Sequence, residues 1–406
     1  MPGNKFIAGA RPGGGRNTVL LIIALVAIAA SQVSLRAEPG IKDKEILIGS
    51  CSALKGPAGE LGTAQLEGAK AYLDYVNAEG GVHGRKIKLL ALDDGYEPGK
   101  AIVCFKRLLK EGVFAGAFFV GTPTAAKHAF LAEENKLPII GLFTGAQLLR
   151  EPFKRYIVNV RASYYDETRE QIDHLWKDLG MRKIGVVYQD DAFGIAVLEG
   201  VRRALKRYGA APAAIGSFPR NSAELKKGVA AVRAAKPEAV ILVGPYKPVA
   251  EIVKASKASA WEPLFVTVSF VGTESFIRAA GRASEGTLIT QVVPPSSRTD
   301  FPGVALYLKL LQRYSPKAEP GFVSLEGFVD AVILVEGLKH AGRELTREKF
   351  LDTIEAMNGL DLGFGPRLKT AFGPKEHQAF NGVYSTVVRD GKAVLFEDWK
   401  ELRGSK

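Results

Sequence analysis

Short apolar segments alternate with longer amphipathic segments from about residue 45 to residue 290. The short segments have the length of buried strands, and the segments between them repeat their apolar residues at helical spacing. Strands are predicted at residues 45–51, 86–93, 113–120, 138–142, 183–188, 211–216, 239–243, 264–268 and 287–290. Such alternation is typical of parallel sheets covered by helices on both faces. The sequence therefore predicts an α/β fold.

Residues 76–100, VNAEGGVHGRKIKLLALDDGYEPGK, contain one such unit in full. Gly80, Gly81 and Gly84 permit the positive φ of a sharp turn from helix to strand. Pro98 and Gly99 follow an acidic loop and begin the next helix. Taken alone, this unit occurs in proteins of many unrelated functions.

The first 37 residues form a separate segment. A positively charged start precedes the apolar run of residues 18–30, and small residues follow. This pattern predicts a secretory signal peptide at residues 1–37, cut after Ala29 or near Ala37. An uncleaved anchor is the alternative, but the run is shorter than the roughly 20 residues that a spanning helix needs.

The formal charge of the chain is +12. The predicted leader contains four basic residues and no acid, so its removal leaves a charge of about +8. Such a charge suits nucleic acid or anionic surfaces. The lysines and arginines are scattered among acids and form no dense run. We interpret them as a solvated surface and predict no nucleic-acid partner.

The chain has two cysteines, Cys51 in the first apolar run and Cys104 within a helical segment. An exported protein could pair them. Both occupy positions of small buried apolar residues, and the sequence does not give the distance on which a bridge depends. Free thiols are predicted rather than a disulfide.

Motifs of common enzymes and cofactor sites are absent from the sequence. The five histidines are isolated, and none has metal-ligand spacing to another histidine or a cysteine. No G-x-S-x-G, phosphate-loop or dinucleotide motif follows a strand. Asp93-Asp94 and Asp190-Asp191 are paired acids at strand ends, where adjacent acids usually serve as loop and cap residues. We predict no catalytic residue, metal or cofactor.

Two strand-to-helix turns carry hydroxyl groups: VGTPT at residues 120–124 and FTGA at residues 143–146. Adjacent helix N-termini with hydroxyls suit a carboxylate or another anion. Ordinary capping by threonine and helix entry by proline explain the same residues equally well.

Several phrases resemble the branched-chain amino acid (Leu/Ile/Val) family of type I periplasmic binding proteins, the substrate-binding proteins of ABC transporters. Residues 76–98 fit the family pattern N-x-x-GG-[IV]-x-G-[RK]-x-[IL] followed by DD-x-x-x-P. Further matching phrases are GPAGELG…EGA at 56–69, EENKLPIIG at 133–141, VVYQDDAFG at 186–194 and ILVGPY at 241–246. The resemblance extends over about residues 45–399.

This resemblance implies two doubly wound parallel-sheet lobes joined by a multi-strand hinge, the Venus flytrap fold. Lobe 1 is expected at residues 44–161 plus 291–370, and lobe 2 at 162–290 plus 372–399. The ligand is expected in the cleft between them. Its expected contacts are Leu61, Thr122, Phe143, Thr144, Gly145, Asp190, Phe193, Tyr246, Ser269 and Phe270.

Within that set, the two turns hold the ligand carboxylate in relatives, and Phe193 closes over the ligand. Amino-acid-binding relatives use a glutamate to pair with the ligand ammonium where this chain has Ser269. A buried ammonium without a partner is unfavourable by several kcal/mol. Either Asp190 or Asp191 takes over that role, or the ligand lacks an α-ammonium. The second explanation is favoured, and it allows carboxylates, amides or a urea-like compound.

The resemblance implies a monomeric, non-enzymatic, periplasmic protein that delivers a small carboxylate- or amino-acid-like solute to an ABC permease pair with cytoplasmic ATPases. A sensor module for a kinase or chemoreceptor would use the same clamshell. A secreted enzyme based on the aspartate pairs is the less favoured alternative.

Overall fold

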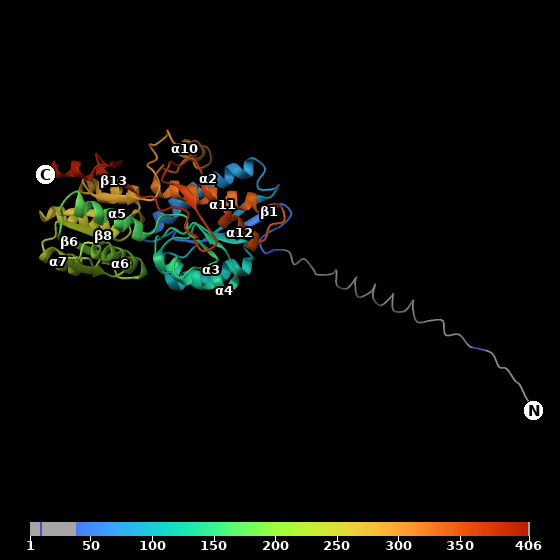
Figure 1. Cartoon of the computed structure of the whole chain (residues 1–406), viewed down its shortest axis with the longest axis horizontal. Helices are drawn as coiled ribbons and strands as arrows, with labels where there is room; N and C mark the ends of the chain where they lie inside the picture. The colour runs from blue at the N-terminus through green and yellow to red at the C-terminus, as the bar shows by residue number, and fades with distance from the viewer. Residues whose placement is uncertain (1–8, 10–37, 405–406) are drawn as a thin grey trace, which may run out of the picture. The chain divides into compact units, whose positions relative to one another are not determined.

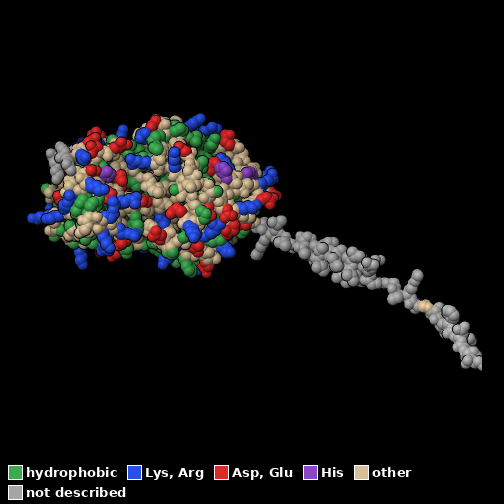
Figure 2. Space-filling view, in the orientation of Figure 1, with side chains coloured by type: hydrophobic (Ala, Val, Ile, Leu, Met, Phe, Trp, Pro, Cys, Tyr) green, Lys and Arg blue, Asp and Glu red, His purple; other side chains and the backbone are tan. Residues whose placement is uncertain are grey.

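The computed structural model describes residue 9 and residues 38–404, which include two α/β lobes (Figure 1). The predicted signal peptide lies outside the described residues, apart from Gly9. Among the described helices, none has both the length and the apolar character needed to cross a bilayer. On the face shown in Figure 2, basic and acidic side chains are interspersed.

The first lobe is built on a five-stranded parallel sheet in the order β2-β1-β3-β4-β5. Its strands are β1 (Glu45–Ser52), β2 (Lys86–Asp93), β3 (Ala115–Ala117), β4 (Ile139–Ile140) and β5 (Ile157–Val158). Its helices are α2 (Gly59–Ala78), α3 (Pro98–Glu111), α4 (Thr122–Asn135), α10 (Pro302–Tyr314), α11 (Phe322–His340) and α12 (Arg347–Ala356). A small antiparallel ribbon follows, β11 (Asn358–Asp361) with β12 (Lys369–Ala371).

Helix α11 is apolar and buried around most of its circumference, as expected for a helix inside a core. It packs closely against α2 because glycines stand at the contact. A Cβ at Gly68 would lie 1.7 Å from the carbonyl oxygen of Ser324, and one at Gly327 would lie 2.0 Å from that of Gln65. These glycines therefore fix the spacing of the two helices.

The second lobe contains a seven-stranded sheet in the order β14-β13-β10-β9-β8-β6-β7. Its strands are β6 (Ile184–Gln189), β7 (Ala214–Phe218), β8 (Ala239–Val243), β9 (Leu264–Thr267), β10 (Leu288–Gln291), β13 (Tyr384–Arg389) and β14 (Lys392–Leu395). Its helices are α5 (Tyr164–Lys177), α6 (Ala192–Lys206), α7 (Lys226–Ala234), α8 (Tyr246–Ala258) and α9 (Thr273–Ala280). The predicted parallel-sheet lobes are confirmed, and β13 and β14 add an antiparallel edge.

Three chain segments that connect the lobes pack together through Ala162, Val292 and Val383, which form a small apolar cluster. The first and third segments also share backbone hydrogen bonds. The N–H of Asn159 donates to the carbonyl of His377 at 2.7 Å, and the N–H of Ala379 donates to the carbonyl of Asn159 at 2.8 Å. The connection between the lobes is therefore a hydrogen-bonded bundle of segments.

The two cysteines are joined in a disulfide, so the prediction of free thiols is wrong. Their predicted burial is confirmed, since Cys51 and Cys104 are 0% and 6% exposed. Helix α3 packs against β1, and this contact brings the two Cα atoms to 6.0 Å. That separation lies within the usual range for a bridge, and only the packing of the two elements determines it.

Candidate functional site

The two hydroxyl-bearing turns lie side by side at the ends of β3 and β4. The N–H of Gly121 donates to the carbonyl of Phe143 at 3.2 Å. The N–H of Phe143 in turn donates to the carbonyl of Phe119 at 2.8 Å. The hydroxyls of Thr122 and Thr144 share a hydrogen bond of 2.6 Å. Parallel strands end at the same edge of a sheet, which is why turns so far apart in sequence combine here.

Gly121 is required at the first turn for two reasons. Its φ is +97°, which side chains other than glycine rarely adopt. A Cβ there would also lie 2.0 Å from the ring of Tyr96. The glycine therefore lets Tyr96 pack directly against the turn that leads into α4.

Five buried rings fill the contact between the lobes above these turns: Tyr96, Phe143, Tyr164, Phe193 and Phe270, here called the interlobe aromatic cluster. The ring of Phe270 lies 4.4 Å from that of Phe193, 5.3 Å from that of Phe143 and 6.0 Å from that of Tyr96. Because Tyr96 and Phe143 belong to the first lobe and the others to the second, this cluster holds the lobes in direct contact.

The hydroxyl of Tyr164 is buried and has no hydrogen-bond partner among the described residues. Burial raises the pKa of Tyr164 to about 12, and Arg161 opposes that shift. A polar atom that lacks a partner beside two threonine hydroxyls marks a place where a polar ligand group could bind.

The other predicted contacts divide into two groups. Leu61 lies in the contact between the lobes, because a Cβ at Gly272 of the second lobe would be 2.3 Å from its Cδ2. Tyr246 begins α8 and is buried beside Glu60 of α2. Burial raises the pKa of Tyr246 to about 12, and the negative charge of Glu60 adds to this effect. Asp190, by contrast, is exposed, and the structure does not bring its side chain into the aromatic cluster.

Asp191 acts as the cap of α6. Its carboxylate accepts the N–H of Phe193 at 2.9 Å and that of Gly194 at 3.2 Å, and Arg220 lies 3.5 Å away. These contacts orient Phe193 at the start of the helix. Since the carboxylate already has several partners, it is poorly placed to pair with a ligand ammonium.

Arg161 was not among the predicted site residues, yet it lies beside the aromatic cluster. Its guanidinium carbon lies 4.9 Å from the ring centroid of Phe143 and 5.9 Å from that of Tyr164. Its Nη2 donates to the hydroxyl of Ser269, and its Nη1 lies 3.4 Å from Glu326. The sequence offers one sign of it, an arginine at the end of the run YIVNV at residues 156–160.

Ser269 is held by Glu167 as well as by Arg161. The carboxylate of Glu167 accepts the Ser269 N–H at 2.8 Å, the Ser269 hydroxyl at 2.9 Å and the Thr290 hydroxyl at 2.7 Å. It also lies 3.3 Å from Arg161. Burial raises the pKa of Glu167, and Arg161 opposes the rise. The carboxylate that contacts Ser269 is thus fully engaged within the protein.

Two groups of polar contacts, here called rims, join the lobes outside the aromatic cluster's five rings. At one rim, Glu274 of α9 accepts the N–H of Phe322 at 3.0 Å, and Arg278 pairs with Glu60 at 2.7 Å. At the other rim, Arg220 pairs with Glu97 at 3.0 Å. Within the described residues, no group of three or more histidine, cysteine, aspartate or glutamate side chains could hold a metal ion.

Asp94 is a buried carboxyl group in the loop that follows β2. Its Oδ1 accepts the N–H of Tyr96 at 2.8 Å, and its Oδ2 has no hydrogen-bond partner among the described residues. Burial raises the pKa of Asp94 to about 7, and the hydrogen bond from Tyr96 offsets only part of this effect.

We expect Asp94→Asn to flatten the pH dependence of stability. Between about pH 4 and pH 7 the folded protein keeps a proton on Asp94 that the unfolded chain has lost. The stabilisation from this group is therefore present at low pH and lost as the pH rises through about 7. Urea unfolding measures the free energy of unfolding at pH 5 and at pH 8. Its decrease from pH 5 to pH 8 should be at least about 1 kcal/mol larger for the native protein than for Asp94→Asn. Exposed Asp43→Asn is the control; parallel profiles for Asp94→Asn and the native protein would contradict this assignment.

The chain is similar to known binding proteins over nearly all of its described length. A family model described as periplasmic binding protein matches residues 45–393. A crystal structure described as a possible leucine/isoleucine/valine-binding protein from Rhodopirellula baltica SH 1 is 32% identical, with a TM-score of 0.85 over 90% of this chain and 99% of that one. A substrate-binding periplasmic protein from Ralstonia solanacearum is 27% identical, with a TM-score of 0.81 over 87% and 100%.

A curated relative gives the same result from sequence alone. The Leu/Ile/Val-binding protein homolog 7 of Brucella suis is 26% identical over 373 residues, which cover 85% of this chain and 88% of that protein. The family and the relatives named here are described as binding proteins.

Proposed function

Because the chain belongs to the periplasmic binding protein family, we propose that it captures a small solute between its two lobes and delivers it to an ABC importer. The observation that carries the proposal is the contact across the lobes between Phe143, which precedes Thr144 of the Thr122–Thr144 hydroxyl pair, and Phe270 of the second lobe. Ligand contacts to both lobes favour the closed arrangement, a shift between hinge states.

The ligand is a small, partly apolar carboxylate that lacks an α-ammonium. Three features support this class. Ser269 stands where amino-acid-binding relatives have a glutamate, and Glu167, the carboxylate that contacts it, is already engaged. The Nε of Arg161 has neither a hydrogen-bond nor an ion-pair partner among the described residues. The surrounding rings supply an apolar wall, as small-molecule sites usually do.

The leader of residues 1–37 would direct export to the periplasm and be removed there. Mass measurement of the protein recovered from the periplasm should give a chain that begins after Ala29 or near Ala37. Membership of the periplasmic binding protein family supports a partnership with a permease and its ATPases. Deletion of the gene should abolish uptake of the ligand; unchanged uptake would favour a sensor.

The ligand itself can be sought by native mass spectrometry of the purified protein, followed by a thermal-shift panel of carboxylates and amino acids. A compound that binds only the folded state raises the melting temperature. We expect aliphatic or aromatic carboxylates to raise it and the corresponding α-amino acids to have little effect. A larger shift with leucine or valine would contradict the ligand class proposed above.

Thr122→Val should weaken the affinity for that ligand by roughly tenfold or more, because a hydrogen bond to a charged group contributes about 1.5–3 kcal/mol. The substitution keeps the shape of the side chain and removes its hydroxyl. Thr353→Val is a matched control, since the exposed Thr353 hydroxyl donates only to the carbonyl of Lys349 in α12. Calorimetry that gives equal affinities for the two variants would remove Thr122 from the site.

A further inference from the structure

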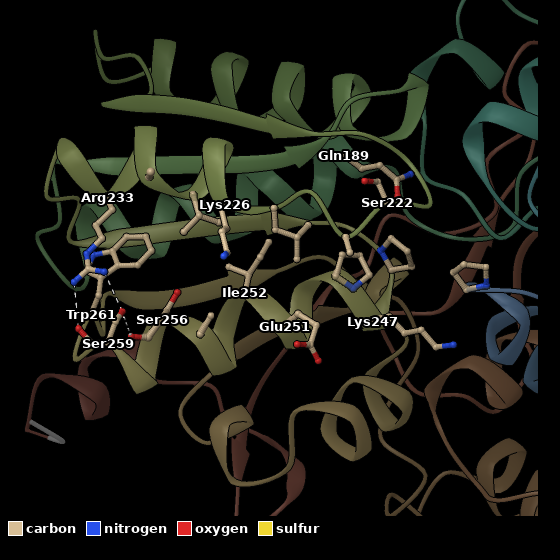
Figure 3. A pocket seen from close by; sticks show the side chains of 18 of the residues that line it. Gln189, Ser222, Lys226, Arg233, Lys247, Glu251, Ile252, Ser256, Ser259 and Trp261 are labelled. Carbon is tan, nitrogen blue, oxygen red and sulfur yellow. Dashed lines mark hydrogen bonds between the residues drawn. The ribbon is translucent and has the colours of Figure 1, made fainter.

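The second lobe carries a groove between α7 and α8, and none of the five rings of the aromatic cluster lines it (Figure 3). Its volume is about 560 Å³, which is within the usual range of small-molecule sites. The groove exists because α7 packs closely against β7, the edge strand of the sheet. A Cβ at Gly216 of β7 would lie 2.0 Å from the carbonyl oxygen of Gly228 in α7. Helix α8 packs instead against α9, and the space between α7 and α8 stays open.

Apolar side chains form the floor and the walls of this groove. They are Leu225 and Val229 from the side of α7, Pro248 and Ile252 from α8, and Trp261 beyond the end of α8. Leu225, Val229 and Trp261 are only partly buried. A continuous apolar surface open to solvent is uncommon on a soluble protein and often marks a binding site.

The charged groups around this surface are mainly positive. Lys226, Arg233 and Lys247 line the groove, and none of them has an acidic partner within ion-pair distance among residues 38–404. The only acid among the described lining residues, Glu251, lies 2.6 Å from Lys254 and is thereby neutralised. The groove therefore has a net positive charge over an apolar floor.

Ser256 provides an independent indication of a ligand. It lines the groove from α8 and is 3% exposed, and its hydroxyl has no hydrogen-bond partner among the described residues. A buried hydroxyl without a partner is unfavourable by about 1–3 kcal/mol. Figure 3 shows Lys226 reaching from α7 toward Ile252, the residue one turn before Ser256.

We propose that this groove is a second small-molecule site, which binds an amphipathic anion with an apolar body and one terminal carboxylate. The apolar body lies between Val229 and Ile252, and the carboxylate meets the Lys226 ammonium and the Ser256 hydroxyl. Charge complementarity selects an anion, and the length of the apolar floor selects a chain or ring system rather than a small inorganic ion. This site does not depend on the ligand proposed for the contact between the lobes.

The test is calorimetric titration of the full mature protein with decanoate, with decylammonium as the probe of equal chain length and opposite charge. We expect decanoate to bind and decylammonium to bind at least about tenfold more weakly. Lys226→Glu should weaken decanoate binding by about tenfold or more. Lys227→Glu is the matched control, because Lys227 is the next exposed lysine of α7 and does not line the groove; it should change the affinity less than about twofold.

A second variant separates this groove from the aromatic cluster. Thr122→Val, which alters the turn of the first lobe, should leave decanoate binding unchanged. Loss of binding in Thr122→Val with retention in Lys226→Glu would place decanoate between the lobes and overturn the proposal. So would equal binding of decylammonium, equal effects of Lys226→Glu and Lys227→Glu, or failure of decanoate to bind.

Discussion

Arg161→Met should lower the free energy of unfolding by about 3–5 kcal/mol, because it leaves the buried carboxylate of Glu167 without its countercharge. Arg161 and Glu167 have side chains only 1% and 0% exposed. Desolvation makes an unpaired charge at such a position expensive. Urea unfolding at neutral pH measures the loss, and methionine fills much of the volume that the arginine stem occupied.

Two further variants separate the charge effect from simple loss of packing. Arg169→Met removes an arginine that is itself 53% exposed from a pair with Asp166, at 2.8 Å, and should change stability by less than about 1 kcal/mol. Arg161→Met combined with Glu167→Gln should recover part of the stability, since the remaining group is neutral. If the double variant were no more stable than Arg161→Met alone, the unpaired charge would not be the cause.

Arg161 contributes both to the stability of the fold and to the proposed ligand site. Its partners come from both lobes: Glu167 and Ser269 from the second, and Glu326 of α11 from the first. Burial raises the pKa of Glu326, with Arg161 opposing the shift. A guanidinium held between the lobes by acids on both sides can orient an anionic ligand while it fixes the geometry of the connection.

The sequence predicts the regular part of the fold well because strand and helix periodicities are local properties. The predicted strand at residues 239–243 has the bounds of β8, and the strand predicted at 45–51 is one residue shorter than β1. Asp390-Gly391, a dipeptide typical of hairpin turns, joins β13 to β14, and both residues have the positive φ that such a turn needs.

The sequence does not show where a ladder of hydrogen bonds ends. A strand predicted over residues 113–120 is reduced to β3 at Ala115–Ala117. The apolar run continues, but Phe118 has a φ of +62° and the chain bends into the turn before α4. Apolar composition alone cannot distinguish a strand from a buried turn, and here the turn is the part that positions Thr122.

The candidate site was predictable where it lies on local motifs and not where it depends on tertiary contacts. Thr122 and Phe143 follow strands and open helices or turns, a pattern visible in the sequence. Arg161 gains its role from Glu167, Ser269 and Glu326, which lie on three separate elements. No spacing in the chain brings these residues together. The disulfide was missed for the same reason, since two buried cysteines can pair only if their elements touch.

Cys51→Ala together with Cys104→Ala should lower the free energy of unfolding by about 4 kcal/mol. The bridge joins residues separated by 53 positions, and closing a loop of that length restricts the unfolded chain by about this amount in the entropic model of cross-links. Alanine suits both buried positions, so the folded structure should change little. Denaturant unfolding of the double variant and of the native protein, both without reductant, gives the difference.

Thiol titration under denaturing conditions distinguishes the bridge from other effects of the substitutions. The native protein should contain no reactive thiol, and the single variant Cys51→Ala should contain one, from Cys104. A loss of stability below about 1 kcal/mol, combined with two reactive thiols in the native protein, would show that the cysteines are not paired. The stability loss arises in the unfolded ensemble, so the affinity of the double variant for the ligand of the interlobe site should equal that of the native protein, provided that the measurement is made where both are folded.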